Sequence, residues 1–115
     1  MIELKETACS DGCGANITPA LLDKLNKFRA AFGKPMNVTS GARCSAVNTK
    51  CGGKVHSAHL VGRAVDFVRT PELLAFCTEE NLAKYNLYME HPDSTPQWIH
   101  ISDRAPPSGK RIFRP

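Results

Sequence analysis

The amino-acid sequence predicts a small α+β domain, with a mainly antiparallel sheet flanked by helices. Segments with the apolar spacing of a helix and segments that alternate as strands do follow one another, without a regular strand–helix–strand order. With 115 residues, the chain has enough interior for one compact core and not for two. We therefore expect residues 1–115 to form a single domain.

Two long helices are predicted from the residues that begin and end them. The first covers 18–32, because Thr18 can cap it, Pro19 suits the first helical position and Gly33 suits its end. The second covers 70–84 and opens with the same threonine–proline pair. The first helix carries an apolar stripe of candidate core residues: Leu21, Leu22, Leu25, Phe28 and Phe32.

The remaining segments are short. Residues 45–50 fit one or two helical turns, and four pieces are expected as strands: 36–39, 64–68, 87–89 and 97–101. Alternation places Val65 and Phe67 on one face and Asp66 on the other, and it places Trp98, His100 and Ser102 together. The polar piece 90–96 contains two prolines and is expected as a loop, and the tail from Ala105 is expected along the surface.

Composition excludes several classes of protein. The chain is 42% hydrophobic and 23% charged, which is ordinary for a globular protein and argues against disorder. No apolar run approaches the ~20 residues of a membrane span, so no membrane contact is expected. The net charge of +4 is mild, and the basic tail lacks a recognition motif, so we expect no binding to nucleic acid. We also expect a monomer.

Five cysteines are many for a chain of this length. The first residues lack the pattern of a secretory signal, so we expect synthesis in the cytoplasm, where thiols stay reduced. A four-thiolate zinc site is one interpretation, and small buried side chains or an adventitious disulfide is the favoured one. The four cysteines concerned are Cys9, Cys13, Cys44 and Cys51; Cys77 is expected inside the second helix.

The most informative stretch of the chain is 57–66. Here His59 precedes a glycine turn, and Asp66 follows within an apolar strand, where an unpartnered carboxylate is costly. Together with His100, these residues would make a two-imidazole, one-carboxylate set that suits zinc and leaves a fourth position for water. The alternative stays open that the histidines are hydrogen-bonded core residues and that Asp66 pairs with Arg63 or Arg69.

Several motifs occur in a fixed order: Ser-Gly-Ala-Arg-Cys at 40–44, Ser-x-His-x-x-Gly-x-Ala-x-Asp at 57–66, and Trp-x-His at 98–100. Together they resemble the zinc D-alanyl-D-alanine carboxypeptidase and L-alanyl-D-glutamate peptidase family, peptidase M15. The likeness covers nearly the whole chain and extends to short bacteriophage endolysins, whose fold is shared with hedgehog signalling domains. It implies that His59, Asp66 and His100 bind zinc. It also implies that Arg43 grips the substrate carboxylate or carbonyl and that Ser57 lies near the substrate backbone.

One position departs from the family pattern. Where the family has an acidic general base, three residues before the last histidine, this sequence has Gln97, which accepts no proton from water. Gln97 is nevertheless a candidate catalytic residue, because its side chain could hold that water or a substrate amide. Three explanations stay open. Glu90, His91 or Asp93 supplies the base; or zinc suffices alone with slower turnover; or the site keeps its metal without catalysis.

The resemblance implies a zinc peptidase that cuts peptidoglycan stem peptides beside a D-amino acid. Such an enzyme would act at the cell wall after release from the cytoplasm or would be carried on a phage particle. The alternative, motivated by Gln97, is a zinc-stabilised wall-binding or phage structural module with weak or no activity.

Overall fold

The computed structural model describes residues 1–9, 12, 14–50 and 57–114. Its centre is an open sheet with the strand order β1-β2-β4-β3-β5, in which every pair is antiparallel except β3 and β5. The strands are β1 (Val38–Ser40), β2 (Ala64–Val68), β3 (Tyr88–Glu90), β4 (Trp98–Ser102) and β5 (Ile112–Phe113). The predicted α+β class with a mainly antiparallel sheet is confirmed.

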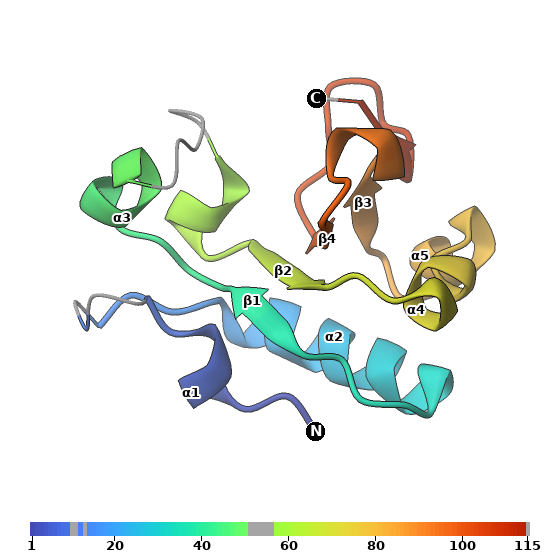
Figure 1. The fold of residues 1–115 in the computed structure, drawn as a ribbon, viewed down its shortest axis with the longest axis horizontal. Coiled ribbons are helices and arrows are strands. Elements are labelled where there is room, and N and C mark those ends of the chain that lie inside the picture. The colour runs from blue at the N-terminus through green and yellow to red at the C-terminus, as the bar shows by residue number, and fades with distance from the viewer. Residues whose placement is uncertain (10–11, 13, 51–56, 115) are drawn as a thin grey trace.

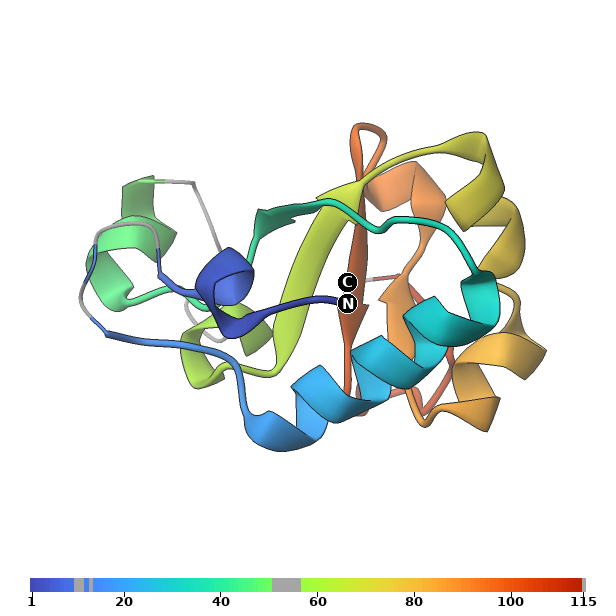
Figure 2. The same cartoon turned by 90° about the horizontal axis from the view of Figure 1, so that it is seen from below.

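Helices surround this sheet. Figure 1 shows α2 running beneath β1 and β2, with α3 and the 3₁₀ helix η1 on the other side, and Figure 2 shows α2 from below. Within the described residues, no helix combines the length and the hydropathy that a bilayer span requires. The helices are α1 (Leu4–Thr7), α2 (Pro19–Phe32), α3 (Ser45–Lys50), η1 (Ala58–Val61), α4 (Pro71–Phe76), α5 (Glu79–Lys84) and η2 (Pro92–Ser94).

The first long helix forms as its capping residues predict. The Thr18 hydroxyl accepts a hydrogen bond from the Leu21 amide, and Gly33 ends α2 in the left-handed conformation with φ of 75°. The apolar stripe of α2 is fully buried at Leu21, Leu25 and Phe28. The helix therefore covers one face of the sheet and forms the core with it.

The two faces of the central strands differ in chemistry. Val65 and Phe67 of β2 and Ile99 and Ile101 of β4 belong to the hydrophobic core. The alternating residues point the other way, and Asp66 of β2 lies opposite His100 of β4 in the ladder. The face predicted to be polar carries the candidate site, and this part of it is buried and not solvent-exposed.

The expected single helix over 70–84 is wrong. It breaks after Phe76 into α4 and α5, and Cys77 is the C-cap of α4, so it does not lie inside a helix. The Thr78 hydroxyl caps α5 by accepting from the Asn81 amide at 3.2 Å. The sequence contains this second start signal, a threonine before two glutamates, within what looked like one periodic segment.

The region 90–113 also differs from expectation. Glu90 lies in β3 and not in a loop, and the tail is not simply a surface segment, because Ile112–Phe113 forms β5. Two backbone hydrogen bonds fasten β5 to β3, from the Met89 amide to the Arg111 carbonyl at 2.7 Å and from the His91 amide to the Phe113 carbonyl at 2.6 Å. Parallel pairing with a distant segment has no local sequence signal.

Candidate metal centre

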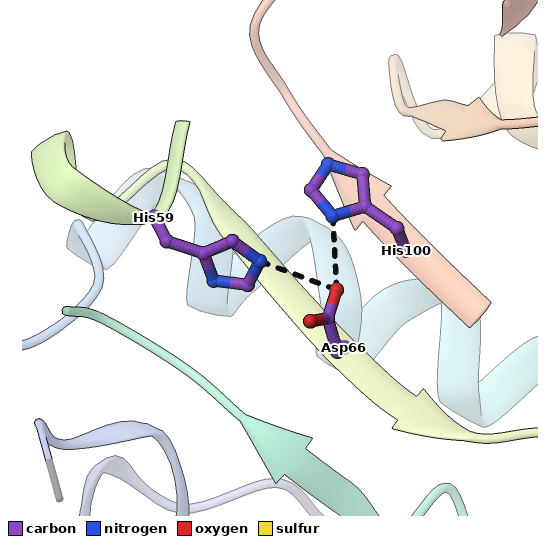
Figure 3. Close-up of side chains that lie close together, drawn as sticks. All are labelled: His59, Asp66 and His100. Atoms are coloured by element: carbon purple, nitrogen blue, oxygen red, sulfur yellow. Dashed lines mark hydrogen bonds and ion pairs between the residues drawn. The ribbon is translucent and has the colours of Figure 1, made fainter. Parts of the chain in front are cut away.

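Three predicted ligands meet on the face of the sheet opposite α2. His59 comes from η1, Asp66 from β2 and His100 from β4 (Figure 3). His59 Nε2 lies 3.2 Å from Asp66 Oδ1, and His100 Nδ1 lies 2.9 Å from the same oxygen. One ligand atom from each residue lies within 4.8 Å of the others. The structure therefore brings together the three residues that the sequence singled out.

The local fold fixes the orientation of His59. Ser57 caps η1, because its hydroxyl accepts from the His59 amide at 3.2 Å. The His59 ring places Nδ1 2.6 Å from the Gly41 carbonyl, so Nδ1 carries the proton and Nε2 is the atom available toward Asp66. A carbonyl that orients a histidine in this way is typical of metal-binding histidines.

Gly41 is required by close packing. A Cβ at this position would lie 2.1 Å from the Thr7 carbonyl oxygen, because the end of α1 passes directly against the backbone of residue 41. The Ala42 amide donates to that same Thr7 carbonyl at 2.8 Å. The glycine in the Ser-Gly-Ala-Arg motif thus lets the chain present its own carbonyl to His59.

Asp66 is ionised in this environment. Burial by itself would raise the pKa of Asp66, but the hydrogen bonds of His100 and His59 and their charges together lower it well below its usual range. The other carboxylate oxygen, Oδ2, accepts from Arg43 Nη2 at 3.1 Å. Both oxygens of this buried carboxylate are therefore partnered.

Arg43 contacts the centre directly. Besides Asp66, its guanidinium donates to Ser40 Oγ at 3.1 Å and Asn48 Oδ1 at 3.4 Å, and its side chain is only 12% exposed. Among the described residues, these contacts use three of its five N–H donors. Two donors remain to bind a further group, so a role in gripping substrate is compatible with this placement and stays a prediction.

The donor set can hold a divalent metal ion. Two imidazole nitrogens and one carboxylate oxygen converge from separate elements onto one point, which is buried and already carries a negative charge. Three protein ligands would leave a coordination position for water or substrate. An open coordination position of this kind is typical of catalytic metal sites.

The alternative in which Asp66 pairs with Arg63 or Arg69 is wrong. Arg63 instead binds Asp103, with Nε 3.0 Å from Oδ1, and Arg69 donates to the carbonyls of Pro92 and Thr95. The arginine that does reach Asp66 is Arg43, 23 positions away. No local signal could have identified this pair, although both residues lie in the motifs quoted above.

Gln97 lies apart from the three candidate ligands. It is exposed and lines a surface hollow with Arg69, Thr70, Pro71, Leu74 and Pro96, and none of His59, Asp66 and His100 lines that hollow. This placement gives no support for a catalytic role of Gln97, which stays a prediction.

The predicted four-thiolate site includes two cysteines that lie outside the described residues. Cys9 and Cys44 lie close together, since the Cys44 amide lies 3.4 Å from Cys9 Sγ. Cys13 and Cys51 lie outside the described residues, as does His56. The four-thiolate site therefore stays a prediction.

A buried His–Asp–His set that could hold a metal ion lies on one face of a small α+β sheet. A protein-family model described as Peptidase M15 matches residues 1–102, which include all three candidate ligands, and the chain belongs to the peptidase M15 family. Its class is thus that of a metallopeptidase. Neither a curated protein nor a solved structure gives a significant match.

Proposed function

We propose that this protein is a zinc peptidase that hydrolyses stem peptides of peptidoglycan beside a D-amino acid, in the manner of a phage endolysin or a cell-wall carboxypeptidase. The observation that carries the proposal is the convergence of His59, Asp66 and His100 in a chain of the M15 family. Zinc binding and cleavage of the peptide substrate can each be measured directly.

Zinc suits the donor set, because it readily accepts a mixture of imidazole and carboxylate ligands. His59 Nε2, Asp66 Oδ1 and His100 Nδ1 would hold it, since these are the atoms that face one another. When bound, zinc supplies Lewis acidity, which polarises a carbonyl and makes water more acidic. The Gly41 carbonyl keeps His59 in the tautomer that ligation needs.

Arg43 supports a role in substrate binding. A guanidinium binds a carboxylate through paired hydrogen bonds better than any other side chain, and two of its donors are available beside the centre. In this proposal, Arg43 holds the carboxylate or carbonyl of the peptide and positions the scissile bond near the metal. Ser57, at the start of η1, contacts the peptide backbone through its hydroxyl.

An exposed apolar pair next to the centre also supports a peptide substrate. Val68 and Trp98 lie opposite each other in the ladder, two positions from the Asp66–His100 pair on the same face of the sheet. Both are unusually exposed for their type, at 41% and 37%. This pair would pack against small apolar side chains such as the methyl groups of alanine residues.

Cleavage of muropeptides by the zinc-loaded protein tests the function. Mass spectrometry is expected to show shortened stem peptides with wild-type protein and with Glu79→Gln, which changes an exposed residue at the start of α5. The His100→Ala variant is expected to lose both bound zinc and cleavage. Intact muropeptides after hours with concentrated, zinc-loaded wild-type protein would overturn the proposal.

A second candidate function is a zinc-stabilised wall-binding or phage structural module. It is favoured by Gln97, which stands where the family has its acidic base. This alternative predicts that the protein binds zinc and sedimenting cell walls without turnover. It also predicts that Gln97→Glu gains an activity that the natural chain lacks.

A further inference from the structure

The residue that could replace the missing acid lies on the strand next to His100. In the β3–β4 ladder, Tyr88 pairs with Ser102 and Met89 pairs with Ile101. Met89 and Ile101 are both buried in the hydrophobic core. Side chains alternate along a strand, so Glu90 lies on the opposite face from Met89, which is the face that carries His100.

The β3–β4 register indicates which residue of β4 lies nearest to Glu90. The ladder ends at the Met89–Ile101 pair, and continuing its register by one residue would place Glu90 opposite His100. Ser40 pairs with Asp66 and Asp66 pairs with His100, so these three residues lie in one row, which the continued register would extend to Glu90 on the adjacent strand β3. Opposite residues in neighbouring strands have their Cβ atoms ~4.5–5.5 Å apart, which is within reach of a glutamate side chain.

The Glu90 side chain is available for chemistry. It is half-buried, and within the described part of the chain its carboxylate has neither a hydrogen bond nor an ion pair. Its backbone is held firmly, because β3 lies between β4 and β5 and residue 90 pairs with Phe113. A fixed backbone with an unengaged acid beside a metal ligand is what a proton acceptor needs.

The other candidate bases in this region are engaged elsewhere. The His91 Nδ1 atom accepts from the Asp93 amide at 3.1 Å, and His91 lies beyond the end of β3 as the N-cap of η2. Asp93 is exposed and contacts Arg114 at 3.5 Å. Gln97 lines the separate hollow and has no ionisable group.

We propose that Glu90 is the general base of this peptidase, taking the role that Gln97 cannot perform. The inference rests on the proposed function. The water oxygen bonds to the scissile carbonyl carbon while one water proton passes to the Glu90 carboxylate. The C–N bond then breaks, and Glu90 delivers that proton to the leaving nitrogen. The second water proton follows the same route, leaving a carboxylate, an ammonium group and Glu90 in its original state.

The test compares Glu90→Gln with the matched control Glu79→Gln, which changes an exposed glutamate at the start of α5. Both variants are expected to bind one zinc per chain by metal analysis. We expect Glu90→Gln to bind intact stem peptide, seen by native mass spectrometry, with a Kd within about threefold of wild type and to cleave it ~10²–10⁴-fold more slowly. We expect Glu79→Gln to cleave at the wild-type rate and Glu90→Asp to keep partial activity.

The outcomes separate the two proposals. If wild type cleaves and Glu90→Gln cleaves equally fast, the base is another group and only the role of Glu90 is overturned. If Glu90→Gln and Glu90→Asp both lose zinc or peptide binding, Glu90 supports the structure of the site and the proposal is likewise overturned. If wild type binds zinc and peptide without cleaving, the peptidase function fails together with the role of Glu90.

Discussion

Arg43 joins the candidate centre to its surroundings through single hydrogen bonds that each use a different nitrogen. Nε, Nη1 and Nη2 donate to Ser40, Asn48 and Asp66 respectively. A lysine has one nitrogen at the end of a flexible chain and cannot reproduce this planar arrangement. The residue thus orients Asp66, and two of its donors stay available for the substrate role proposed above.

Arg43→Lys is therefore expected to impair the enzyme although it keeps the positive charge. Loss of a charge-assisted hydrogen bond to substrate corresponds to ~1.5–3 kcal/mol, so kcat/KM should fall by about 10–100-fold, mainly through a higher KM. Steady-state kinetics on a stem peptide measure this, with Arg29→Lys on α2 as the control. Unchanged kinetics in Arg43→Lys would contradict the assigned role.

The close packing of Gly41 against Thr7 predicts the effect of a substitution on stability and zinc affinity. Gly41→Ala forces a Cβ against the Thr7 carbonyl, so the free energy of unfolding should fall by about 1–3 kcal/mol. Zinc affinity should fall as well, since the displaced Gly41 carbonyl is the partner of His59. Denaturant unfolding and zinc competition measure the two effects. Gly33→Ala has open space around its Cβ and should lower stability by ~1–2 kcal/mol without changing zinc affinity.

Cys77 is expected to be unreactive in the native protein. Burial raises the pKa of its thiol from 9.0 to about 12, so almost no thiolate exists at pH 8. Alkylation with iodoacetamide, read by mass spectrometry of the digest, should modify Cys77 only after denaturation. The thiol ionises more readily in the unfolded chain, so its contribution to stability is complete below about pH 9 and declines as the pH rises toward 12. Equal alkylation rates in native and denatured protein would show that Cys77 is accessible.

The elements of this fold differ in how far their own sequence determines them. The start of α2 is visible in Thr18 and Pro19, and β2 is visible in its alternating residues, so both were predicted correctly. The α4–α5 break was missed because apolar periodicity continues across it, and β5 was missed because its two residues pair with a strand more than twenty positions away. The candidate ligands were found from motif spacing. The position of Glu90 required the β3–β4 register, which only the folded chain provides.

The Thr18 N-cap is expected to stabilise the whole of α2. Thr18→Ala removes the hydroxyl that accepts from Leu21, and we expect the free energy of unfolding to fall by ~1 kcal/mol. Thr18→Ser keeps the hydroxyl and should retain most of the stability. Thermal unfolding followed by circular dichroism compares the two variants. If Thr18→Ala and Thr18→Ser unfold at the same temperature, the cap contributes nothing to α2.

At the scale of the whole molecule, the candidate centre brings together side chains from three separate elements. His59 lies on a short 3₁₀ helix beside β1 and β2, while His100 lies on a central strand whose other neighbour is β3. An ion bound between them would stabilise the folded chain only, since the unfolded chain lacks the arrangement.

Zinc is therefore expected to raise the melting temperature. At a free zinc concentration 100 times the Kd, the added stability is ~2.7 kcal/mol, and a chelator should remove it. Differential scanning calorimetry measures the shift at several zinc concentrations. The His100→Ala variant should melt at one temperature throughout, and a wild-type protein that did the same would have no zinc site.

The contact between Thr7 and Gly41 connects the first residues of the chain to the loop that orients His59. Ile2 is buried and its amide donates to Asn26 of α2, so the first residues are anchored from their beginning up to the loop that orients His59. An affinity tag or fusion partner joined directly to Met1 would disturb the packing of Ile2 and its hydrogen bond to Asn26. Recombinant protein intended for kinetic work should therefore leave this end unmodified or separate any addition from it with a flexible spacer.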